Sequence, residues 1–182
     1  MVIEAAFELT REIGWEAVTT RNIARKLGSS TMPIYSTVKS MEEIESEVVD
    51  KALALMVEYQ KKPFTPDPMV NIGVGYVVFA RDEHNLFSFL YRAERPVPEG
   101  SFSTEGRNGF FKKAFAGLPG VGESLKEIPA DSMEALMLKS WIFTHGLAVM
   151  INSGVLNLRD DKIAELVTDA GGAFYMYKGG ST

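Results

Sequence analysis

An all-α fold is what this sequence predicts, on two kinds of signal. Apolar residues recur at the three- and four-residue spacing of one helix face, from the start of the chain to its end. In residues 2–13 they are Val2, Ala5, Ala6, Leu9 and Ile13, and in residues 160–177 they are Ile163, Leu166, Val167, Ala170, Phe174 and Tyr177. Between such segments, capping residues, glycines and prolines stand where helices begin and end. The 182 residues, 46% of them apolar, suffice for one sizeable core or for a small head on a larger body.

The N-terminal part predicts two short helices around a tight turn, the shape of a helix-turn-helix. Thr19 is placed to cap the first of them, and Gly28 ends it because glycine tolerates the left-handed conformation of a helix stop. Ser30 then caps the second, and Pro33 falls in its first turn, where a missing N–H does no harm. By itself, this pattern also fits an ordinary helical corner.

Charge separates this stretch from the rest of the chain. Residues 17–41 contain no Asp or Glu, whereas the whole chain has a net charge of −5. The basic residues of the stretch are Arg21, Arg25, Lys26 and Lys39. A basic segment in an acidic chain is typical of a surface that faces phosphates.

The same stretch resembles the DNA-binding domain of TetR-type (tetracycline-repressor-like) bacterial transcriptional regulators. The family pattern is roughly T-x-x-x-I-A, then G-V-S-x-G-x-L-Y-x-H-F-x-S-K-x-x-L, preceded by a helix of the form I-x-x-A-A-x-x-L-x-x-x-x-G. The matching residues are Val2, Ala5, Ala6, Leu9, Gly14, Thr19, Ile23, Ala24, Gly28, Ser30, Ile34, Tyr35, Ser40 and Ile44. The detailed resemblance ends near Asp50 and combines many positions at fixed spacing.

Several positions depart from the family pattern. Ser29, Met32 and the pair Thr37-Val38 replace the usual Val, Gly and His-Phe. Met41 replaces a Lys that in the family commonly meets a phosphate, which predicts weaker or differently placed backbone contact. The sequence also begins directly in the first helix, without the short basic arm that family members usually carry; either the arm is lacking or the sequence is shortened.

A DNA interface follows from this resemblance. The second helix, residues 31–37, is expected in the major groove, where base edges carry a unique donor and acceptor code. Thr31 and Ser36 are candidates for bases or phosphates, and Met32 and Pro33 for thymine methyl groups. The candidates for holding phosphates are Thr19, Arg21, Tyr35 and Lys39, with Ser30 at the helix start. No Arg, Asn or Gln stands in residues 31–37, so specificity would come from apolar contacts, hydroxyls and DNA shape.

A long fourth helix, about residues 42–61, is predicted to join this head to the remainder. Its apolar face is broad enough to touch more than one partner, so we expect it to pack on the head at one end and on the body at the other. Pro63, Pro66 and Pro68 stop it and stiffen the connection. We therefore predict a DNA-binding head at residues 1–45 and a ligand-binding and dimerisation body at residues 62–182, with the boundary within 56–67.

Further helices are predicted in the body. We expect them at residues 68–80, 83–94, 103–116, from Asp131 or Ser132 to Asn152, and at 160–177. Residues 117–131 are rich in Gly and Pro and are predicted to form a long loop.

The last two helices predict a homodimer. Residues 133–151 are apolar on nearly every side, and a helix apolar all round must be buried all round. Gly171 and Gly172 lie inside the final helix, where each costs about 1 kcal/mol against Ala but permits close approach of another helix. The resemblance implies the same dimer, through a four-helix bundle, and Trp141 with His145 and Gly146 is similar to a W-x-x-x-H-G segment found there in part of the family. The predicted interface residues are Val149, Ile163, Val167, Gly171 and Phe174.

A pocket for an apolar small molecule is also implied by the resemblance. The chain is rich in large, adaptable apolar side chains of the kind that suit such a pocket: it has eleven Phe, nine Met, six Tyr and two Trp. The candidate lining residues are Phe87, Tyr91, Phe110, Phe111, Met137, Trp141 and His145. Each aromatic residue alone also fits a core position, and His145 on a mostly apolar helix fits a hydrogen-bonded core histidine.

Other classes of function find little support in the sequence. No nucleophile elbow, Walker loop, dinucleotide turn or zinc-protease motif is present, so we expect no enzyme, no catalytic residues and no cofactor. Two His and no Cys argue against a metal site. No signal peptide or membrane-spanning run is visible, and we expect a cytoplasmic protein that does not enter a membrane.

Two functions remain open at this point. The first is a homodimeric repressor that binds a palindromic double-stranded DNA operator and is released by an apolar small-molecule effector. The second is a dimer of the same shape that binds a ligand or a protein and has lost DNA binding. Met41, Ser29, the absent basic arm and the overall acidity favour the second.

Overall fold

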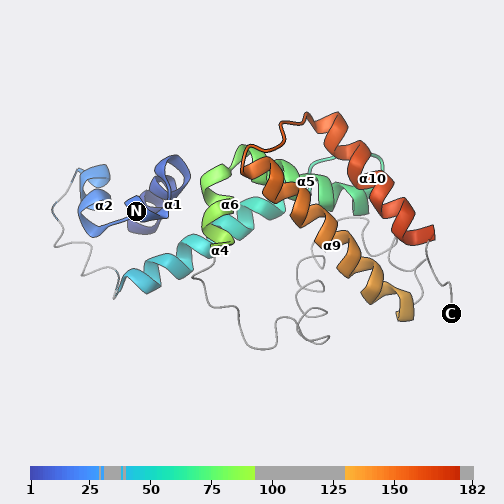
Figure 1. Ribbon diagram of the computed structural model, residues 1–182. Helices are drawn as coiled ribbons and strands as arrows, with labels where there is room; N and C mark the ends of the chain where they lie inside the picture. Colours follow the sequence, from blue (N-terminus) through green and yellow to red (C-terminus); the bar gives the residue numbers. More distant parts are fainter. Residues whose placement is uncertain (29, 31–37, 39, 93–129, 177–182) are drawn as a thin grey trace.

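The computed structural model describes residues 1–28, 30, 38, 40–92 and 130–176. Within them the elements are α1 (Val2–Ile13), a short 3-10 helix η1 (Trp15–Ala17), α2 (Thr20–Leu27), α4 (Met41–Gln60), α5 (Pro68–Asp82), α6 (His84–Leu90), α9 (Ala130–Asn152) and α10 (Asp160–Met176). No strand occurs in this part of the chain. Figure 1 shows α1 and α2 at one end, α5, α9 and α10 at the other, and α4 running between them. The predicted all-α fold is confirmed.

The helix ends follow the local signals in the sequence. The Thr19 hydroxyl accepts a hydrogen bond from the Asn22 N–H at the start of α2, and Gly28 ends that helix in the left-handed region at φ 63°. Asp67 accepts from the Met69 N–H at 2.8 Å, with Pro68 in the first turn of α5. These capping predictions are confirmed.

Some of the predicted boundaries differ by a few residues from those of the structure, and others cannot be compared. α6 ends at Leu90 instead of reaching residue 94, because Tyr91 has left the helical conformation at φ −113° and ψ 20°. α9 begins at Ala130, one residue before the earlier of its two predicted caps. α10 spans Asp160–Met176, and Tyr177 lies outside the described residues. The predicted helix at 103–116 and most of the predicted loop at 117–131 also lie outside them.

α4 bridges the two ends of the molecule. It contacts α1, α5 and α6, as its broad apolar face predicts. Its buried residues are Ile44, Val48, Val49, Ala52, Met56 and Gln60. The five apolar ones belong to one hydrophobic core that runs continuously from α1 to α10.

α5 is the central helix of the body. It contacts α4 along one side and α9 and α10 along others, and two glycines permit these close approaches. A Cβ at Gly75 would lie 2.4 Å from the carbonyl oxygen of Tyr59 in α4. A Cβ at Gly73 would lie 2.8 Å from Cγ1 of Val167 in α10. The glycines therefore set how closely α4 and α10 pack on α5.

α9 is buried on only one side within a single chain. Met137, Leu147, Ala148 and Ile151 are buried, whereas Ile142, on another face, is 60% exposed. Val149 and Met150 are also exposed. A single chain thus does not bury this helix all round, which leaves an apolar face on its surface.

Two of the predicted dimer-interface residues are corrected by the fold. Ile163 is fully buried and Val167 nearly so, inside the core of their own chain. Periodicity identified the buried face of α10 correctly, but that face packs on α5 within the chain and is not available to a second copy. None of the described helices is long and apolar enough to cross a membrane.

Candidate functional site

The N-terminal helices hold basic side chains at the surface of residues 1–45, the segment called the head below. Arg21 and Arg25 on α2 are exposed. Lys26 is exposed as well, but its ammonium group contacts both carboxylate oxygens of Glu12 on α1 at 2.8 Å. The Asn22 amide donates to the carbonyl of Ala17 at 2.7 Å and fixes η1 against α2. α2 is thus firmly placed, with Arg21 and Arg25 directed to solvent.

The predicted DNA-contacting residues fall into two groups. Thr19, Arg21 and Ser30 are described and lie at the surface, exposed in each case. Thr31, Met32, Pro33, Tyr35, Ser36 and Lys39 lie outside the described residues. The segment that contains them is bounded by Gly28, which ends α2, and by Ser40, which caps α4 by accepting from the Glu43 N–H.

The start of α4 differs in charge from α2. Met41 packs against the hydrophobic core instead of pointing toward solvent. Glu42 and Glu43 are exposed in the first turn, where the positive end of the helix dipole favours carboxylates. A hydrogen bond with Ser40 lowers the pKa of Glu42 below its ordinary value. Phosphate contacts are therefore unfavourable at this helix end.

The body contains a cluster of aromatic rings, formed by Tyr76, Phe87, Tyr91, Trp141 and His145. The ring centroids of Phe87 and Tyr91 are 4.8 Å apart, and those of Tyr91 and His145 are 4.9 Å apart. Trp141 lies 5.8 Å from His145, one turn away on α9. These rings come from α5, α6 and its C-terminal end, and α9, so the cluster joins the consecutive helices α5 and α6 to α9, which is distant in sequence.

One polar pair lies within this aromatic cluster. The hydroxyl oxygen of Tyr76 is 2.8 Å from Nδ1 of His145. Burial raises the pKa of Tyr76 far above its ordinary value, and the neighbouring Tyr91 raises it further. Burial lowers the pKa of His145 below 6.5. Both groups are therefore neutral at pH 7, and they offer a ligand hydrogen bonds without charge.

Most of the predicted pocket residues that are described meet in this cluster. Phe87, Tyr91, Trp141 and His145 contact one another or Tyr76. Met137 is buried one turn before Trp141, and Phe110 and Phe111 lie outside the described residues. The sequence analysis missed Tyr76. Its position in the apolar run of α5 was a usable signal, since a buried tyrosine hydroxyl needs a partner.

No group of three or more His, Asp or Glu side chains suited to a metal ion occurs among the described residues. The chain contains no cysteine. The chemistry available at the cluster is thus apolar contact with a few neutral hydrogen bonds.

Comparison with known proteins identifies the fold. No protein-family model matches the chain, and no curated protein matches it either. A solved structure does: the crystal structure of a TetR-like transcriptional regulator from Rhodococcus sp. RHA1 matches with a TM-score of 0.64 at 15% sequence identity. The match covers 97% of this chain and 94% of that one. The architecture of the chain is therefore the all-α TetR-like fold along nearly its whole length.

Proposed function

We propose that the protein is a DNA-binding transcriptional regulator that acts as a homodimeric repressor on a palindromic operator. The observation that carries this proposal is the fold, shared with a TetR-like transcriptional regulator over 97% of the chain. In the proposal, residues 1–45 bind DNA, α4 connects, and residues 62–182 bind an effector and the second copy. An apolar small molecule bound in the body releases the protein from DNA.

The surface of α2 supports the DNA-binding part of the proposal. Thr19 caps α2 and Arg21 lies in its first turn, both exposed, and Arg25 lies exposed one turn further on. A hydroxyl and two guanidinium groups on one short helix suit contacts with phosphates, which position a protein on a duplex. Residues 31–37 would then enter the major groove, with the chemistry that their sequence supplies.

The free face of α9 supports the homodimer. Ile142, Gly146, Val149 and Met150 are exposed and follow one another at helical spacing, so they form one face. Among the described residues, no atom outside the glycine's own stretch of helix lies within 4 Å of a Cβ built on Gly146, nor of one built on Gly171 or Gly172 in α10. Packing within the chain therefore does not require glycine at these positions. A second helix packed closely against them from another copy would require it.

The proposed dimer surface accordingly differs from the one predicted from sequence. Val149, Gly171 and Phe174 remain in it, with Ile142, Gly146 and Met150 added. Ile163 and Val167 are excluded because the core of their own chain covers them.

The aromatic cluster supports the effector part of the proposal. Its rings surround the neutral Tyr76–His145 pair, a combination that suits an uncharged, largely apolar molecule with few polar groups. Tyr91, at the end of α6, is 37% exposed, so the cluster has an accessible side. An effector there would contact α5, α6 and α9 at once. It would release DNA only by binding one arrangement of the heads better than the other.

Fluorescence anisotropy with duplex DNA tests this function. The protein is titrated into a labelled duplex from the region flanking its own gene, and into a scrambled duplex, at two salt concentrations. The matched pair of variants is Arg21→Ala, on the proposed interface, and Arg159→Ala, an exposed arginine in the α9–α10 connection. Loss of a phosphate contact should weaken binding to both duplexes and flatten the salt dependence, whereas Arg159→Ala should match the wild type.

The outcome separates the two candidate functions. Preference for the flanking duplex, with affinity falling steeply as salt rises, supports the regulator. No preference over the scrambled duplex by a protein that is dimeric in solution supports the alternative, a binding module of the same shape without operator recognition.

A further inference from the structure

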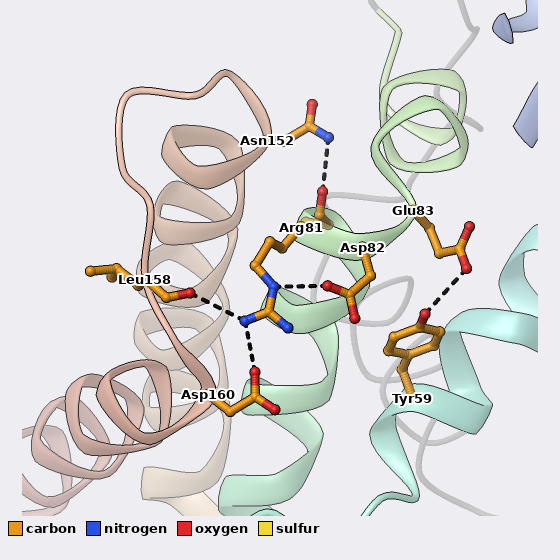
Figure 2. A network of polar contacts seen from close by, with 8 residues as sticks. Tyr59, Arg81, Asp82, Glu83, Asn152, Leu158 and Asp160 are labelled. Carbon is orange, nitrogen blue, oxygen red and sulfur yellow. Dashed lines mark hydrogen bonds and ion pairs between the residues drawn. The ribbon is translucent and has the colours of Figure 1, made fainter. Parts of the chain in front are cut away.

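A buried carboxylate joins three helical segments where α5 meets α6. Glu83 is only 5% exposed and lies between these two helices. It accepts two hydrogen bonds from the guanidinium group of Arg11 on α1, at 2.7 and 2.6 Å. It also accepts one from the hydroxyl of Tyr59 on α4, at 3.2 Å, which Figure 2 shows. A paired arginine fork is among the strongest and most directional hydrogen-bonding arrangements in proteins.

Further contacts attach α6, which follows this carboxylate in the chain, to the head. The Asn85 amide donates to the carbonyl oxygen of Arg11 at 2.9 Å. At the other end of α6, Phe89 stacks on Trp15 with centroids 4.8 Å apart, and Arg92 pairs with Glu45. The short α6 is therefore held to the head at its beginning and at its end.

The same junction is attached to the body in the opposite direction. Arg81, two residues before Glu83, donates to the Leu158 carbonyl at 3.2 Å and to Asp160 at 2.7 Å (Figure 2). Asn152, at the end of α9, donates to the carbonyls of Ala80 and His84 at 2.9 and 3.1 Å. Arg81 thus binds the α9–α10 connection and the start of α10, Glu83 binds the head, and Asp82 between them pairs with Arg81.

We infer that Glu83 is a positioning residue, which sets the orientation of the head relative to the body through Arg11 and Tyr59. A buried carboxylate with a bidentate arginine has few alternative arrangements of similar energy, because any displacement of α1 leaves it without its charged partner Arg11. The Arg11–Glu83 ion pair therefore favours one head orientation, whereas the apolar contacts around it are compatible with several. In a dimer, a fixed head orientation also sets the separation of the two heads, and with it the preferred spacing of the DNA half-sites. This consequence rests on the proposed function.

Distance measurement in the full-length chain tests the inference without DNA. The chain has no cysteine of its own, so spin labels can be placed at Arg25→Cys on α2 and at Asn157→Cys, both exposed positions. Asn157 lies between Leu156 and Leu158, which pack against the core and hold its backbone in place. Labelled chains are diluted with unlabelled ones, and double electron–electron resonance gives the head-to-body distance distribution within one chain.

The variants form a graded series at the junction. Arg11→Met removes the charged partner, Arg11→Lys keeps the charge but not the fork, and Tyr59→Phe removes one hydrogen bond. Arg159→Met is the matched control, because it breaks a bidentate arginine–carboxylate pair that does not join head and body. Ile163→Val controls for lost stability, since it lies in the core away from the junction.

The expected result is one narrow distance peak in the wild type and in both controls. The peak should broaden or shift in Arg11→Met, and should be partly restored in Arg11→Lys. If Arg11→Met does not fold, a broadened peak in Tyr59→Phe carries the same conclusion. Wild-type distributions in Tyr59→Phe and in every folded Arg11 variant would overturn the inference.

A second readout separates this inference from the proposed function. The wild type first selects duplexes from a random library, and these duplexes are rebuilt with altered half-site spacing. The affinities of the wild type and of Arg11→Lys for the rebuilt duplexes are then compared. A relaxed spacing preference in the variant, with single half-site affinity unchanged, is the expected result. If the wild type selects no duplex, the proposed function fails, while the distance series still decides whether Glu83 positions the head.

Discussion

The hydroxyl oxygen of Tyr76 lies 2.8 Å from Nδ1 of His145, so one neutral hydrogen bond joins α5 to α9 inside a cluster of aromatic rings. The tyrosine is buried and the histidine half-buried, and burial raises the pKa of Tyr76 and lowers the pKa of His145. The pair therefore depends on both groups remaining uncharged, which makes the body sensitive to acid at this point.

Acid should destabilise the protein partly through His145. Its pKa is lowered in the folded state by burial, so below the ordinary value of 6.5 the unfolded chain binds the proton more readily. The stabilisation is complete above 6.5 and is lost as the pH falls through the folded-state pKa. Urea unfolding midpoints measured on both sides of 6.5 should fall less for His145→Asn than for the wild type. His84→Asn, at an exposed histidine, is the control, and an equal change there would contradict the assignment.

Strong alkali should destabilise the protein partly by ionising Tyr59. Burial, and then the nearby Glu83 carboxylate, raise the pKa of Tyr59 from 10.0 to about 12. Between these values the unfolded chain has lost the proton and the folded chain keeps it, so stability is complete below 10.0 and declines as the pH rises to about 12. Tyr59→Phe should show a shallower decline in urea midpoint over that range. Identical slopes for the two proteins would show that Tyr59 ionises as freely in the folded state as in the unfolded chain.

A methyl group at Gly75 should strain the packing of α5 on α4. The added Cβ would lie 2.4 Å from the Tyr59 carbonyl oxygen and 2.5 Å from Cα of Gln60, backbone atoms that cannot turn aside. Overpacking of this kind costs about 1–3 kcal/mol, against a gain of about 1 kcal/mol in helix propensity. Gly75→Ala should therefore lower the free energy of unfolding in urea. Gly73→Ala meets movable side-chain atoms of Val167 and Thr144 and should cost less; the reverse order would refute this explanation.

Local features were predictable from the sequence, and long-range partners were not. The Thr19 and Asp67 caps act within three residues, so the chain itself contains the whole signal. Arg11 and Glu83 are separated by 72 positions, and helical periodicity does not specify which helices meet. Ile163 illustrates the same limit: its face on α10 was identified correctly, but its partner proved to be α5 of the same chain.

The residues of the candidate site show the same difference between local signals and long-range contacts. Four aromatic positions of the body cluster were predicted, because rings on helix faces point to a common interior and the family resemblance supplied the location. Tyr76 was overlooked, since it stands in an apolar run that periodicity assigns to the core. Its hydrogen bond to His145 depends on α5 and α9 lying side by side, and no local pattern in the sequence indicates that contact.

The exposed apolar face of α9 should control self-association. Val149→Glu places a carboxylate at the centre of the proposed dimer surface, where burying an unpaired charge costs several kcal/mol. Sedimentation velocity should show a dimer for the wild type and a monomer for this variant. Val155→Glu, at an exposed valine in the α9–α10 connection, should remain a dimer. A dimer that persists in Val149→Glu would place the interface elsewhere.

The claim that two copies of this chain bind DNA together is tested most directly by hydroxyl-radical footprinting on the region flanking its own gene. We expect two protected patches of related sequence in inverted orientation, with centres roughly 34 Å, or one helical turn, apart. Arg21→Ala should weaken both patches equally. Uniform cleavage of the duplex at protein concentrations where the dimer is intact would contradict the claim.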